Sequence, residues 1–107
     1  MGIYNLIVMK GAIMSTILIK HKVSDYSTWK NAFDNFADFR KSSGEKSFRI
    51  LHQESDPNDL TLLFEWDSQQ NAESFLTSEK LKSTMQEAGV TEAPNIQFLN
   101  EVAEGSL

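Results

Sequence analysis

The segment Leu60–Ser68 (LTLLFEWDS) constrains the fold of this chain more than any other, because it joins an apolar strand to a helix. Leu60–Trp66 is the most apolar stretch with strand character, so we expect it at the centre of a sheet. Asp67 is expected to begin a helix, and Gln70, three residues later, completes a capping box. A large aromatic residue, Trp66, therefore lies where the central strand ends.

Alternation of apolar and polar residues predicts three further strands, each with one buried face. They are Thr16–Val23, Lys46–Gln53 and Asn95–Val102. The segment Asp56–Asp59 (DPND) has the composition of a turn. The second and third strands are therefore expected to form an antiparallel hairpin.

Two regions change to a helical period of three to four residues. The first follows a capping Asp25 and runs as one amphipathic helix of about four turns to the stop at Ser42–Gly44. The second begins at Asp67, is expected to break near Ser78, and stops at Gly89. Helices of this kind cover one face of a sheet.

The order β-α-β-β-α-β predicts an α+β ferredoxin-like fold with a four-stranded antiparallel sheet and both helical regions on one face. The other face would carry one leucine from each strand, namely Leu18, Leu51, Leu63 and Leu99. A soluble monomer rarely leaves such an apolar patch exposed. We therefore expect a homodimer that forms through this face of the sheet.

Composition excludes several classes of function. The 107 residues are expected to form one domain over residues 14–103, with an N-terminal extension (1–13) and a C-terminal tail (104–107). A net charge of −5 argues against a nucleic-acid partner. The apolar run Ile3–Met9 is too short to cross a membrane. The chain has no cysteine, which excludes thiolate metal sites and is compatible with a cytoplasmic location.

An aromatic cluster is expected at one end of the sheet. The first and third strands are interpreted as parallel neighbours, so that their ends and the start of the first helix meet there. The members of the cluster are His21, Tyr26, Trp29, Phe48 and Trp66. Such a cluster can bind a flat hydrophobic molecule. The alternative is that these aromatic residues only close the core.

Two of these residues can move a proton. His21 and Tyr26 are the candidate catalytic residues, with Trp29, Phe48 and Trp66 lining the ligand pocket. His52 is a further pocket candidate, although the expected strand directions place it at the opposite end from His21. The two histidines are therefore not expected to share a metal, and each has the alternative of a histidine at the rim of the core.

Three stretches resemble the antibiotic-biosynthesis-monooxygenase-like (ABM-like) group of the dimeric α/β-barrel superfamily. They are Val23–Phe33 (VSDYSTWKNAF), Asp56–Ser78 (DPNDLTLLFEWDSQQNAESFLTS) and Leu81–Val102. The resemblance implies a homodimer and one candidate activity, a cofactor-independent monooxygenase that acts on a small aromatic or polyphenolic compound. The alternative is a non-catalytic dimer that binds a small ligand or a partner.

The haem-degrading branch of the same superfamily is disfavoured by two residues. Its members carry a tryptophan that distorts the haem and a histidine that ligates the iron, and these positions fall on Phe75 and Met85. A thioether is a much poorer replacement for an imidazole ligand here. No haem, other cofactor or metal is therefore expected.

Overall fold

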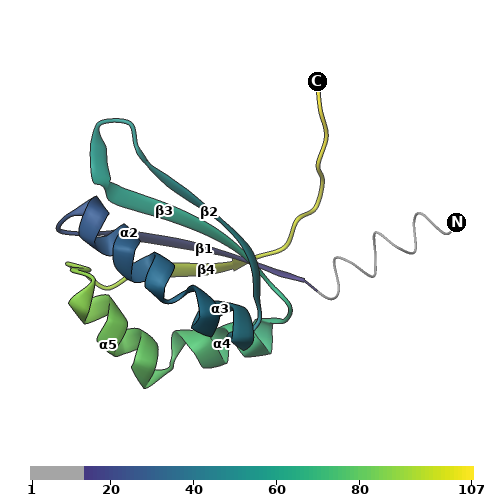
Figure 1. Ribbon diagram of the computed structural model, residues 1–107. Helices are drawn as coiled ribbons and strands as arrows, with labels where there is room; N and C mark the ends of the chain where they lie inside the picture. Colours follow the sequence, from purple (N-terminus) through teal and green to yellow (C-terminus); the bar gives the residue numbers. More distant parts are fainter. Residues whose placement is uncertain (1–13) are drawn as a thin grey trace, which may run out of the picture.

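The structure is a computed structural model that describes residues 14–107, and the predicted N-terminal extension, residues 1–13, lies outside the described residues (Figure 1). Residues 14–107 contain four strands and four helices. In chain order they are β1 (Ser15–Lys22), α2 (Tyr26–Asn35), α3 (Ala37–Ser43), β2 (Glu45–Gln53), β3 (Asp56–Trp66), α4 (Gln69–Leu76), α5 (Glu79–Glu87) and β4 (Asn95–Leu99).

The strands form one sheet in the order β2-β3-β1-β4, and each neighbouring pair is antiparallel. The helices lie on one side of this sheet (Figure 1). The core fills the space between the two layers and includes Ile17, Leu60 and Leu62, which are almost completely buried. The predicted α+β ferredoxin-like fold is confirmed.

The strand directions differ from the prediction in a way that moves the candidate residues. β1 and β3 are antiparallel neighbours, with Ser15 opposite Trp66 and His21 opposite Leu60. Trp66 and His21 therefore lie at opposite ends of the sheet. His52 is also paired with Leu60, so the two histidines lie at the same end, about two strand spacings (~10 Å) apart. The prediction that His21 and Trp66 share one end of the sheet was wrong, and so was the prediction that His21 and His52 lie at opposite ends. The reason is that β3 lies between β1 and β2 and is antiparallel to both.

The first helical region is two helices rather than one. The break is at Phe36, whose backbone N–H is shared between the carbonyl oxygens of Ala32, at 3.1 Å, and Phe33, at 3.3 Å. α3 then ends at Gly44, which has a φ of +127° that a residue with a Cβ rarely adopts. This break sets the direction of α3 separately from that of α2.

The β2–β3 connection also differs from the prediction. The turn is at Glu54 and Ser55, and the DPND segment belongs to β3. The ladder shifts register here, because Gln53 pairs with Asp56 whereas His52 pairs with Leu60. Asn58 lies in this irregular part and accepts a hydrogen bond from the backbone N–H of Tyr26 at 2.8 Å. The turn-like residues therefore form a bulge that holds the start of α2.

The second helical region begins one residue later than predicted. Ser68, not Asp67, caps α4 by accepting the backbone N–H of Asn71 at 3.1 Å. The predicted break is confirmed, since Ser78 caps α5 by accepting the backbone N–H of Leu81 at 3.2 Å. Within residues 14–107, no helix is long and apolar enough to cross a membrane.

The face of the sheet away from the helices carries the predicted leucines. Leu18 and Leu63 are paired across β1 and β3 at its centre and are half-buried. Leu51 and Leu99, on the edge strands, are 40% and 38% exposed. We call this leucine-bearing surface the open face.

Candidate functional site

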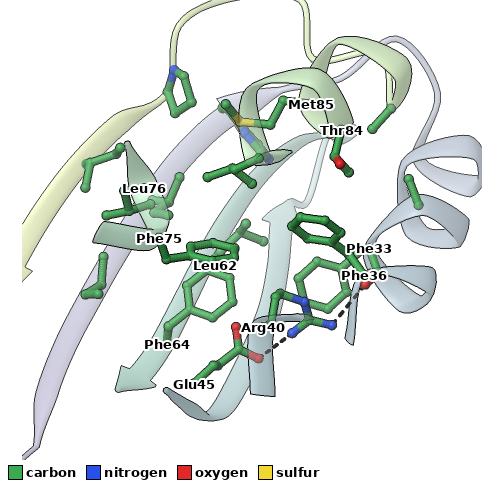
Figure 2. Close-up of a pocket in the computed structure, with 18 of the residues that line it drawn as sticks. Phe33, Phe36, Arg40, Glu45, Leu62, Phe64, Phe75, Leu76, Thr84 and Met85 are labelled. Carbon is green, nitrogen blue, oxygen red and sulfur yellow. Dashed lines mark hydrogen bonds and ion pairs between the residues drawn. The ribbon is translucent and has the colours of Figure 1, made fainter. Parts of the chain in front are cut away.

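A cavity of about 240 Å³ lies between the sheet and the helices. Its wall is mostly apolar and is formed by residues of all four strands and all four helices of the described chain. Figure 2 shows many of these side chains around the cavity. Two tryptophans contribute, Trp29 from α2 and Trp66 from the end of β3. The cavity therefore has the composition of a pocket for a small, largely apolar molecule.

Aromatic rings pack in pairs along the wall. Trp29 stacks on Phe33 with ring centroids 5.0 Å apart. Trp66 lies 5.0 Å from Phe75. Trp29 and Trp66 are only 4% and 2% exposed, so packing holds their rings in place. Such rings offer flat surfaces against which another ring can stack.

His21 contributes a polar group to this wall. It is 6% exposed, and its ring meets Trp29 edge-on at 5.8 Å between centroids. Neither ring nitrogen has a hydrogen-bond partner. Burial lowers the pKa of His21, so the neutral imidazole is favoured. A neutral imidazole offers one N–H donor and one nitrogen that can accept a proton.

A second polar group, Arg40 with Glu45, comes from the end of α3 and the start of β2. The Arg40 Nη1 donates to Glu45 Oε2, and Nη2 donates to the carbonyl oxygen of Phe33 at 3.0 Å (Figure 2). The guanidinium carbon lies 3.6 Å from the centroid of the Phe33 ring. Burial raises the pKa of the Glu45 carboxyl, and the charge of Arg40 opposes that rise.

Sequence reasoning missed this pair. In the sequence, Arg40 occupies an apolar position of its helix, and Glu45 carries no signal beside the predicted strand. A charged residue within an apolar helical stripe was the available clue, because a buried charge needs a partner. The partner could not be identified, since the turn at Gly44 brings Glu45 back to Arg40.

The unpaired polar atoms are concentrated at this cavity. Among the described residues, four buried side-chain nitrogen or oxygen atoms lack a partner: both ring nitrogens of His21, Nε of Arg40 and Oε1 of Glu45. All three residues line the cavity. Buried polar groups in native proteins are almost always hydrogen-bonded. A polar molecule in the cavity would give these atoms the partners that the chain does not.

α5 and β4 form the least buried parts of the wall, and Ile96 of β4 is 38% exposed. Leu81, Thr84 and Met85 line the cavity, and Figure 2 shows Thr84 and Met85 on the helix above it. None of the residues of α5 is buried, whereas each of the other three helices buries at least one. The cavity is therefore least enclosed where α5 and β4 form its wall.

The other sequence candidates lie outside the cavity wall. Tyr26 is half-buried and packs against Trp29, with 6.0 Å between ring centroids. Phe48 is 44% exposed and meets Phe33 edge-on at 5.0 Å. His52 is exposed. The structure thus brings His21, Trp29 and Trp66 to one cavity and leaves the remaining three beside it.

The two positions that disfavoured haem also line the cavity. Phe75 comes from α4 and Met85 from α5, and neither offers an imidazole. Within residues 14–107, no group of three or more histidine, cysteine, aspartate or glutamate side chains is placed to hold a metal ion.

Comparison with known proteins identifies the fold. A protein from Bordetella bronchiseptica assigned to the antibiotic biosynthesis monooxygenases matches with a TM-score of 0.73 and 13% identity, over 85% of this chain and 99% of that chain. SnoaB from Streptomyces nogalater, a cofactor-independent oxygenase, matches with a TM-score of 0.65 and 14% identity, over 89% and 97%. NE2512 from Nitrosomonas europaea, a protein of unknown function, has a TM-score of 0.65 and 10% identity, over 89% and 95%.

No protein-family model and no curated protein matches the sequence. The structural matches show that the chain has the ABM-like fold, as its resemblance to that group implied. At these identities the matches define the fold and leave the activity to the residues of the site.

Proposed function

We propose that this protein is a cofactor-independent monooxygenase that acts on a small phenolic aromatic compound. The observation that carries the proposal is the 240 Å³ apolar cavity in which two tryptophans and an unpaired, neutral His21 line the same wall. The tryptophans would hold the ring of the substrate, and the imidazole would accept its phenolic proton. The SnoaB match adds support, because that fold accommodates oxygenase chemistry without a cofactor.

The reaction balances with oxygen as the sole co-reactant. Removal of the phenolic proton by His21 leaves an electron-rich phenolate, which can pass an electron to O₂. Overall, one phenol and one O₂ give one quinone and one water. One oxygen atom enters the ring and the other leaves as water with two hydrogens from the substrate. The substrate supplies all four electrons, so no external reductant is needed.

Oxygen consumption with a panel of one-ring and two-ring phenols tests this function. We expect uptake with at least one phenol, and a fall of about 100-fold or more in kcat/KM for His21→Gln, because general-base catalysis is worth roughly that factor. His52→Gln is the matched control, since His52 is exposed and lies outside the cavity wall. The proposal fails if no phenol supports uptake, or if the two variants behave alike.

The second candidate is a non-catalytic protein that binds a small aromatic ligand. One observation favours it: no carboxylate or carbonyl orients the imidazole of His21, whereas a catalytic histidine usually has such a partner. Binding of phenols without oxygen uptake would identify this function.

We also propose that two copies of the chain associate through the open face. Leu18 and Leu63 at its centre, with Leu51 and Leu99 at its edges, form an apolar surface that water contacts in a single protomer. A hollow of about 350 Å³ is lined by Leu63 and Leu99 of this face, among others. Burial of this surface by a second copy would stabilise the association.

A further inference from the structure

We propose that Arg40 and Glu45 form a binding site for a hydroxyl group on an aromatic ligand of one or two rings. The pair would bind that hydroxyl group at the Trp66 end of the cavity, and His21 lies towards the other end. This inference rests on the proposed function only in requiring that the cavity takes an aromatic molecule. It assigns ligand recognition to two residues that the reaction does not use.

The bonds made by Arg40 and Glu45 leave one nitrogen atom and one carboxylate oxygen atom without any partner. Arg40 uses Nη1 on Glu45 and Nη2 on the carbonyl oxygen of Phe33. Its Nε–H remains without an acceptor, and Oε1 of Glu45 remains without a donor. The two side chains are only 6% and 7% exposed, so bulk water does not supply the missing partners. An ion pair buried in this state is costly unless its remaining atoms are hydrogen-bonded.

The free atoms specify the kind of group that fits. Nε–H is a donor and Oε1 is an acceptor, and a hydroxyl group can satisfy both types, since it accepts one hydrogen bond and donates another. An ether or a methyl group cannot donate. A carboxylate would meet the charge of Glu45, and an ammonium would meet that of Arg40, so a neutral group is favoured. A phenolic hydroxyl has these properties.

Aromatic contacts hold the guanidinium in place before any ligand arrives. Its carbon is 3.6 Å from the centroid of Phe33 and 5.3 Å from that of Phe48. Cation–π contacts of this kind add to the hydrogen bond with the Phe33 carbonyl oxygen. Little ordering is then needed on binding, which favours affinity.

The size of the cavity limits the ligand. An apolar cavity of roughly 150 Å³ can hold benzene. The cavity in this protein measures about 240 Å³, which leaves room for one further ring or for ring substituents. A ligand with four fused rings is too large for this volume. Hydroxylated benzenes and naphthalenes are therefore the class of ligand that matches both the size and the polar site.

Fluorescence can measure this recognition directly. Both tryptophans of the chain, Trp29 and Trp66, line the cavity, so quenching of their emission reports its occupancy. The probes are naphthalene and 2-naphthol, which differ by one hydroxyl group. We expect the full-length protein to bind 2-naphthol at least about tenfold more tightly, the factor expected for a hydrogen bond to a charged group.

The variant that tests the anchor is Arg40→Met with Glu45→Leu, which removes both charges together and leaves neither partner buried alone. We expect it to bind the two probes with similar affinity. Lys30→Met with Asp34→Leu is the matched control, because that ion pair is on the surface of α2. The control should keep the preference for 2-naphthol. Arg40→Lys keeps the charge but lacks Nε–H, and we expect it to lose about as much of the preference for 2-naphthol as the double variant does. This single variant tests the anchor if the double variant fails to fold.

The outcomes separate the two proposals. A preference for 2-naphthol that survives Arg40→Lys or the double variant overturns the anchor, and so does equal binding of both probes by the unmodified protein. If neither naphthalene nor 2-naphthol binds, the idea that the cavity takes an aromatic molecule is overturned. Selective binding that depends on Arg40, without oxygen uptake by any phenol, would confirm the anchor and reject the monooxygenase.

Discussion

His21 is a residue whose environment has a measurable consequence for stability. Burial lowers the pKa of His21 from its ordinary value of 6.5. The unfolded chain therefore binds a proton more readily than the folded one at pH values just below 6.5. The stability associated with the neutral ring is fully present above that pH and is lost as the pH falls towards the lowered pKa.

We therefore expect the free energy of unfolding to decrease below pH 6.5 in the unmodified protein, by at most about 1.4 kcal/mol per pH unit from this group. His21→Gln should lack this component, and His52→Gln should retain it. Urea unfolding from about pH 5 to about pH 8 measures the slopes. The raised pKa of Glu45 changes the free energy of unfolding with pH in the opposite direction. Because Glu45 is present in all three proteins, its contribution cancels when their slopes are compared. Parallel curves for the His21 and His52 variants would contradict the prediction.

At the residue scale, the sequence predicted part of the cavity wall. His21, Trp29 and Trp66 were expected in a pocket, and all three line the cavity. The reason for expecting a shared pocket was that all three residues would lie at one end of the sheet, and that reason was wrong. They share the cavity because it extends along the sheet. Arg40 and Glu45 could not be paired in advance, since their contact depends on the direction of the chain at Gly44.

Gly44 links two elements, and it explains why α3 can turn directly into β2. Its φ of +127° is one that residues with a side chain rarely adopt. A Cβ built on Gly44 would also lie 2.4 Å from Oδ1 of Asp67, which holds Asn71 of α4 through a 3.0 Å hydrogen bond. The backbone carbonyl oxygen of Gly44 accepts the N–H of Asp67 at 2.9 Å. One glycine thus joins the ends of α3 and β3.

Gly44→Ala is expected to destabilise the protein by roughly 1–3 kcal/mol, the cost of a strained backbone conformation. Gly105→Ala is the matched control, because a Cβ at Gly105 meets nothing within 4 Å. Urea unfolding measures both changes. Repeating Gly44→Ala in an Asp67→Ala background removes the steric contact and leaves the backbone strain. A Gly44→Ala protein as stable as the Gly105→Ala protein would refute this account.

At the element scale, the type and order of the elements were predictable, and their boundaries were less so. Periodicity predicted the strands, and the Ser78 break between α4 and α5 was confirmed by its cap. The break at Phe36 was missed, because the apolar spacing continues across it and only the backbone conformation changes. The DPND segment was placed in a turn because its residues favour irregular backbone, and the structure uses them in a bulge.

At the scale of the whole molecule, the open face predicts a dimer. Leu63, half-buried at the centre of this face, lies opposite Leu18. We expect the unmodified protein to sediment as a dimer at micromolar concentration. Leu63→Lys should shift it towards monomer, because a charge would be buried in an apolar interface. Gln70→Lys, which adds a charge on exposed α4, is the control and should leave the dimer intact. Sedimentation of the unmodified protein as a monomer would overturn the prediction.

The sequence alone determined the fold class, the two faces of the sheet and the aromatic nature of the core. These properties follow from periodicity, which each element expresses locally. The tertiary structure alone decided which ends of the strands meet, how Arg40 reaches Glu45, and that a cavity remains between the layers. Those properties depend on the relative directions of elements far apart in the chain. A local pattern of residues carries no information about such directions, because they are set by how the packed layers close around the core.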